Sequence, residues 1–143
     1  MQPRADAEDQ LLGVLLGAGH LARGMRRHAC ARHLFDSLRL AYPERASPWL
    51  GLALLEIDSQ DPALAARHCR AALQRAPDHA LAQAWLGVCH LMLGDGVTAS
   101  YWLRRARNAG SPTARQLAEA MLGLIAFAEG NADAAVLLAE VAP

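Results

Sequence analysis

The sequence predicts an all-α domain built from antiparallel helical hairpins. The chain of 143 residues matches itself when it is shifted by 34 residues, a step typical of repeated helical hairpins. Of its residues, 53% are hydrophobic but only 5% are aromatic, a composition that suits closely packed helices better than a sheet sandwich. Serine–proline and aspartate–proline pairs recur where helices would start. At this length the chain is expected to form one domain.

The repeat is visible as columns of matching residues. These columns are Ala31, Ala65 and Ala99; Leu38, Ala72 and Ala106; Phe35, Cys69 and Leu103; Gly19, Ala53 and Gly87; and Pro43 with Pro77. A fourth unit follows at a step of 36, where Leu86, Gly87, Gly94 and Ala99 match Leu122, Gly123, Gly130 and Ala135. Small residues let two antiparallel helices approach closely, and larger residues fill the space beside them. Each unit is therefore predicted to be one helical hairpin.

Residues that begin and end helices divide the chain in the same way. The start signals are Ser47-Pro48, Asp61-Pro62 and Ser111-Pro112, with Asp78 and Asn131 as further caps, and the turn residues are Gly24, Gly94, Gly96 and Gly130. The predicted helices span about residues 8–24, 27–41, 48–58, 62–75, 79–93, 97–109, 113–128 and 132–141. No stretch alternates between apolar and polar residues as a strand would, so no sheet is expected.

The spacing resembles that of the tetratricopeptide repeat, in which tryptophan, leucine-glycine, alanine, an aromatic residue, alanine and proline follow one another. The best-matching unit contains Trp49, Leu52, Ala53, Ala65, Cys69, Ala72 and Pro77. Glu56 and His90 depart from the pattern, because they stand where the family has tyrosine. The resemblance implies a single domain over residues 1–143. This domain would be a right-handed solenoid of about four repeats, at 12–45, 46–79, 80–113 and 116–143.

The resemblance also implies a binding groove, because the first helix of each hairpin lines the concave side of such a solenoid. The implied groove residues are Leu16, His20, Leu50, Leu54, Ile57, Ala84, Val88, Leu91, Leu124 and Phe127. Nearly all are apolar, and together they would expose a patch larger than a monomer normally leaves bare. We expect another protein to cover it with an amphipathic helix or an extended apolar segment. Residues 50–55 have a second interpretation, since they can be buried between helices on all sides.

Two kinds of function fit this groove. The stretches Phe35–Leu40, Trp49–Leu52 and Val88–Leu91 resemble the small tetratricopeptide chaperones and assembly proteins of bacterial type III secretion systems, which implies a chaperone for an export substrate, and so a part in protein transport and virulence. The alternative is a structural scaffold subunit in a constitutive homo- or hetero-oligomer. A clamp for a terminal carboxylate is disfavoured, because the chain has no lysine and Leu54 and Val88 stand where a polar donor is needed.

Charge and cysteine usage exclude several other partners. Fourteen acidic residues balance fourteen basic ones, so no net field attracts nucleic acid, although Arg104, Arg105 and Arg107 form a local basic stripe. The three cysteines are widely spaced and odd in number, which indicates a reducing compartment and a cytoplasmic protein. No apolar run approaches the length of about 20 residues that a membrane-spanning helix needs.

The sequence predicts no enzyme and no cofactor. It contains no glycine-rich phosphate loop, no nucleophile elbow and no pair of carboxylates that the repeat would place in the groove. His28, Cys30 and His33 resemble metal ligands, as do His68 with Cys69 and Cys89 with His90. These groups fall on different predicted helices at core positions of the repeat, so ordinary packing is the favoured interpretation and no metal is predicted.

Overall fold

The computed structural model describes residues 3–130, which form seven α-helices. They are α1 (Pro3–Gly24), α2 (His28–Ala41), α3 (Ser47–Asp58), α4 (Pro62–Arg75), α5 (Ala80–Met92), α6 (Gly96–Arg107) and α7 (Pro112–Gly130). The described residues contain no strand, and the all-α prediction is confirmed. The first helix begins at Pro3, several residues earlier than expected. The predicted eighth helix, 132–141, lies outside the described residues.

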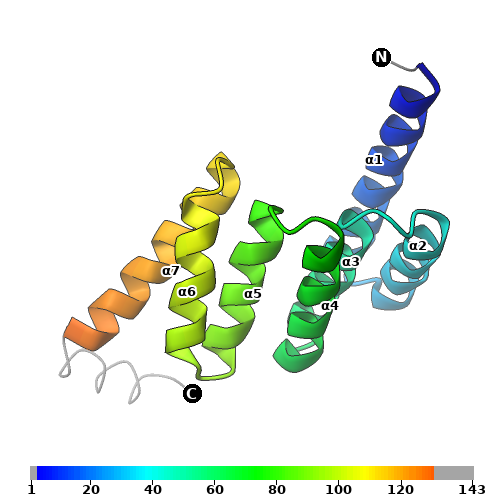
Figure 1. The fold of residues 1–143 in the computed structure, drawn as a ribbon. Coiled ribbons are helices and arrows are strands. Elements are labelled where there is room, and N and C mark those ends of the chain that lie inside the picture. The colour runs from blue at the N-terminus through cyan, green and yellow to red at the C-terminus, as the bar shows by residue number, and fades with distance from the viewer. Residues whose placement is uncertain (1–2, 131–143) are drawn as a thin grey trace.

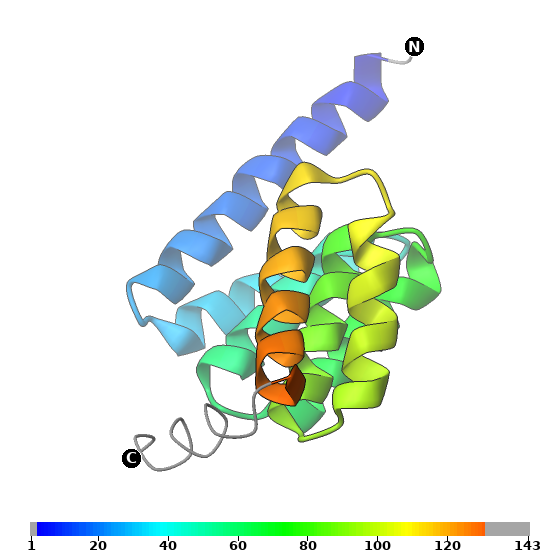
Figure 2. The ribbon, with the colours of Figure 1, turned by 90° about the vertical axis from the view of Figure 1, so that its left-hand side faces the viewer.

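The helices are arranged in two rows of antiparallel neighbours (Figures 1 and 2). Each helix packs against the next along the chain, and α1, α3, α5 and α7 also pack against one another in order. The backbones of α2 and α4, and those of α4 and α6, do not approach each other closely in the described part of the chain. The first helices of the hairpins therefore form a continuous inner row, while the second helices lie separately on the outside.

The glycine columns of the sequence mark the points where two helices of a hairpin come closest. A Cβ atom on Gly19 would lie 2.6 Å from Phe35 Cε1, and one on Gly87 would lie 2.7 Å from Leu103 Cγ. Phe35 and Leu103 are both fully buried. The middle hairpin has Ala53 and Cys69 at these positions, both within one buried cluster. Here a larger first residue faces a smaller second one, so the helices can still pack closely.

Side-chain caps define four helix starts. Asp61 and Ser111 accept hydrogen bonds from the backbone N–H groups of Leu64 and Ala114, which confirms two predicted caps. Ser47 does not cap α3, because the helix has already begun there and Ala46 holds the N-cap position. His79, rather than Asp78, caps α5 through Nδ1, and Asp95 caps α6 by accepting from Thr98.

The turn between α1 and α2 differs from the prediction that Gly24 would form it. Gly24 remains within α1, and Arg26 adopts the left-handed conformation instead, with φ of 59°. A residue with a Cβ atom is disfavoured in this region by roughly 1–2 kcal/mol. The contacts of the two helices fix this turn, since the Arg27 N–H donates to the Ala22 carbonyl and closes α1.

We predict that Gly87→Ala destabilises the protein and that Gly13→Ala stabilises it. The new methyl group at residue 87 would overlap Leu103, at a cost of about 1–3 kcal/mol. Gly13 lies within α1 with open space around it, so alanine should add about 0.5–1 kcal/mol. Urea unfolding followed by circular dichroism measures both changes. Equal stability of Gly87→Ala and the parent chain would contradict the close approach of α5 and α6.

Candidate functional site

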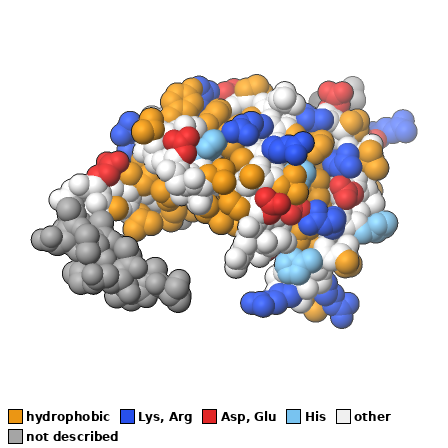
Figure 3. Space-filling model, turned by 90° about the horizontal axis from the view of Figure 1, so that it is seen from below, with side chains coloured by type: hydrophobic (Ala, Val, Ile, Leu, Met, Phe, Trp, Pro, Cys, Tyr) orange, Lys and Arg blue, Asp and Glu red, His pale blue; other side chains and the backbone are white. Residues whose placement is uncertain are grey.

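The inner row of helices carries most of the predicted groove residues on its accessible surface. Those that are half-buried are Leu16 and His20 in α1, Leu54 and Ile57 in α3, and Val88 and Leu91 in α5. In α7, Leu124 is 48% exposed and Phe127 is 50% exposed. This side of the molecule is hollowed, with hydrophobic side chains gathered above the hollow in Figure 3. The accessible apolar surface thus increases towards α7.

Two of the predicted groove residues belong to the core. Leu50 is 8% exposed, and Ala84 has no exposed surface. Ala84 packs with Leu103 and Ala114, in the cluster formed by α5, α6 and α7. These two residues pack beneath the inner row, and they have almost no accessible surface for a partner to contact.

The accessible groove residues are anchored to this core. Leu16 packs against the cluster around Phe35, Ile57 against the cluster around Cys69, and Leu91 against the cluster between α5 and α7. Their positions are therefore fixed by packing before any ligand arrives. A preformed apolar surface binds with a smaller loss of side-chain entropy than a mobile one.

His20 is an uncharged member of the row at neutral pH. Its ring lies 5.0 Å from that of Phe35, at an angle of 58°. Burial lowers the pKa of His20, and the nearby Arg23 guanidinium lowers it further. The neutral imidazole keeps this part of the inner row close to apolar.

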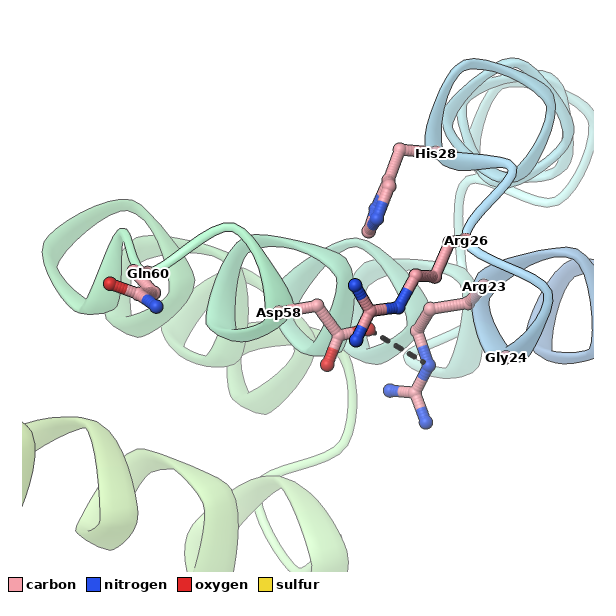
Figure 4. A pocket seen from close by; sticks show the side chains of 6 residues that line it. All are labelled: Arg23, Gly24, Arg26, His28, Asp58 and Gln60. Atoms are coloured by element: carbon pink, nitrogen blue, oxygen red, sulfur yellow. Dashed lines mark ion pairs between the residues drawn. The ribbon is translucent and has the colours of Figure 1, made fainter.

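A polar pocket lies where the carboxyl ends of α1 and α3 meet the α1–α2 turn. It has a volume of about 460 Å³ and is lined by Arg23, Gly24, Arg26, His28, Asp58 and Gln60 (Figure 4). Arg23 Nε lies 3.4 Å from Asp58 Oδ2. One carboxylate thus faces two guanidinium groups, which leaves the pocket with an excess of positive charge. Figure 3 shows arginine and histidine side chains gathered on the right of the hollow.

Sequence reasoning missed this pocket. Its residues come from two segments thirty positions apart, 23–28 and 58–60, and no spacing rule links them. Arg26 and Gln60 also share an unusual feature, because both have positive φ, at 59° and 60°. Arginine and glutamine are not typical of that conformation, so the left-handed geometry of the two turns was not expected from the sequence.

The other sites considered from the sequence are a metal site and a basic stripe. Between residues 3 and 130, no three His, Cys, Asp or Glu side chains gather as metal ligands would. The Arg105 side chain of the basic stripe is held within α6, where its Nη1 donates to the Tyr101 hydroxyl. Tyr101 is an exposed aromatic residue beside this stripe. None of the described helices is both long and apolar enough to cross a membrane.

Comparison with known proteins identifies the repeat. A family model described as tetratricopeptide repeat matches residues 16–71 and again residues 50–115. Among solved structures, the chain is similar to the Sgt2 TPR domain from Aspergillus fumigatus, with a TM-score of 0.69 and 19% sequence identity. That match covers 92% of this chain and 85% of the other. At this identity the likeness concerns the fold alone. No curated protein matches the chain.

We predict that the free energy of unfolding decreases as the pH falls from 7.5 to 5.5. Burial is the largest cause of a lowered pKa at four histidines, His20, His68, His79 and His90. The unfolded chain, with histidine pKa values of about 6.5, then binds more protons than the folded chain as the pH falls through that value. Urea midpoints measured across this range test the effect. A midpoint that rises on acidification would contradict the neutral state of these histidines.

Proposed function

Because the chain belongs to the tetratricopeptide repeat family, we propose that it holds a segment of another protein against its inner row of helices. Tetratricopeptide repeats are protein-binding modules, and their curvature creates an extended concave surface for the partner. The observation that carries the proposal is the row of preformed apolar side chains from Leu16 to Phe127 along α1, α3, α5 and α7. Binding, rather than catalysis, is the activity that this surface supports.

The chemistry of the inner row favours a partner segment that is apolar at one end and acidic at the other. Exposed Leu124 and Phe127 provide the apolar end, in α7. Arg23 and Arg26 provide a positive pocket at the other end, beside α1 and α3. Burying about 300 Å² of apolar surface would contribute on the order of 7 kcal/mol before the costs of association. An acidic side chain in the pocket would fix the direction in which the segment lies.

The role in type III secretion remains a prediction. It rests on the local resemblance of three sequence stretches, and neither the matching family model nor the Sgt2 domain names a secretion system. The broader statement, a chaperone or assembly factor that keeps an apolar segment covered, needs only the inner row. Capture of a secreted substrate by the purified chain, with loss of capture by the variants below, would extend the proposal to secretion.

We predict that the double variant Leu124→Glu, Phe127→Glu fails to bind apolar peptides that the parent chain selects from a phage-displayed library. Two carboxylates at the apolar end would be desolvated by the bound segment, at a cost that removes detectable binding. Val97→Glu is the matched control, because Val97 is 86% exposed on α6 and lies outside the inner row. Fluorescence anisotropy with a labelled peptide measures affinity. Equal affinity for both variants and the parent would place the binding surface elsewhere.

We predict that Arg26→Glu reverses the preference for acidic peptides. The selected peptide should bind to this variant on the order of tenfold more weakly, which corresponds to a loss of about 1.4 kcal/mol in binding free energy. A peptide in which its acidic residue is replaced by lysine should bind the variant better than the parent. Titrations in low and high salt test the origin of the effect, because screening should reduce the difference. A preference that Arg26→Glu leaves unchanged would exclude the pocket from the binding surface.

A further inference from the structure

Helix α1 carries an apolar stripe that the inner row does not include. The outer stripe consists of Leu11, Val14, Ala18 and Leu21, and it continues into Met25, which follows the helix. Leu11 is 52% exposed, Val14 70%, Leu21 66% and Met25 58%. The residues are spaced three and four positions apart in alternation, which is the spacing of a helix–helix seam.

No other helix in the described residues covers this stripe. Among the described helices, α1 packs only against α2 and α3, and its buried positions there include Leu12, Gly19 and Ala22. It is also long, with 22 residues, and residues 4–11 are all exposed. Figure 2 shows its N-terminal part projecting beyond the ends of the other helices. The stripe is therefore both apolar and sterically accessible to a second molecule.

We propose that the outer stripe pairs in antiparallel orientation with the outer stripe of a second copy of this chain. The stripe is nearly symmetric about residue 16, so the two-fold pairing places Leu11 of one copy opposite Leu21 of the other. The same register places Val14 opposite Ala18, so that a larger side chain faces a smaller one. Such a self-complementary surface is what a two-fold interface requires.

The charges along α1 select the same orientation. Its first turns carry three acidic residues, Asp6, Glu8 and Asp9, and one basic residue, Arg4, whereas its end and the following turn carry Arg23, Arg26 and Arg27. Antiparallel pairing brings the acidic end of one copy to the basic end of the other, and parallel pairing would oppose like charges. Asp9 and Arg23 already pair with Arg45 and Asp58 within the chain. Asp6 and Glu8 at one end, and the exposed Arg26 and Arg27 at the other, have no ion pair within the described residues. The register of the stripe brings Asp6 of one copy opposite the turn of the other copy that carries Arg26 and Arg27.

The first test is the mass of the purified chain over a wide range of concentrations, measured by sedimentation velocity. We expect a reversible monomer–dimer equilibrium in the parent chain. In Val14→Glu and in Leu21→Glu the dimer should be weakened by at least about tenfold. Val97→Glu, at an even more exposed valine, should dimerise like the parent. Circular dichroism establishes that each variant is folded.

The orientation is tested with cysteine variants in a Cys30→Ser background, which removes the exposed cysteine. On oxidation, a mixture of Leu11→Cys and Leu21→Cys chains should form the mixed disulfide, and Leu11→Cys alone should not link to itself. Self-linked Leu11→Cys would overturn the antiparallel pairing. Asp6→Arg should weaken the dimer, and the swap Asp6→Arg with Arg27→Asp should restore it.

Peptide binding by the inner row and pairing of the outer stripe can be tested independently of each other. The variant Leu124→Glu, Phe127→Glu should lose peptide binding and keep the dimer, and Val14→Glu should keep peptide binding and lose the dimer. A parent chain that stays monomeric at every concentration would overturn the pairing. So would a dimer that persists in Val14→Glu but dissociates in Leu124→Glu, Phe127→Glu, because the copies would then meet through their inner rows.

Discussion

The close approach of two helices within each hairpin is the constraint on which the rest of the structure depends. Gly19 leaves space for Phe35, and Gly87 leaves space for Leu103. Because each of these pairs is buried, the two helices of a hairpin are locked at short range and act as one unit. The units then stack through the second helix of one hairpin against the first helix of the next, and through the first helices, which pack in order from α1 to α7. The hollow on the inner side follows from this stacking.

Binding surface and core are therefore two sides of the same inner helices. Ala84 faces α6 and α7 and is fully buried, whereas Leu91, two turns later in α5, is half-buried and packs against the same cluster. A side chain that is held on one side by the core and free on the other keeps a defined position while offering surface. This explains how a chain with few aromatic residues can present a preformed apolar row.

The sequence predicted the helices well and the accessible surface less completely. Columns such as Gly19 with Gly87 reflect local packing within a hairpin, which recurs at every repeat and so leaves a periodic signal. Exposure has no such signal, because Leu50 and Leu54 lie one turn apart on α3 and differ only in what their neighbours cover. The pocket around Arg23 and Asp58 depends on two turns in left-handed conformations at non-glycine residues, which propensities do not predict.

Helix α1 takes part in both proposed surfaces without a conflict between them. Successive residues of a helix are about 100° apart, so Leu16 in the inner row points about 160° away from Val14 in the outer stripe. A second copy on the stripe would thus leave the inner row open, and the two-fold pair would present two hollows at once. Two linked sites bind a partner that displays two segments far more tightly than one site does, provided that the geometry allows both to engage. Self-association through α1 would in this way strengthen partner binding instead of replacing it, which distinguishes this arrangement from a scaffold whose groove is filled by its own copy.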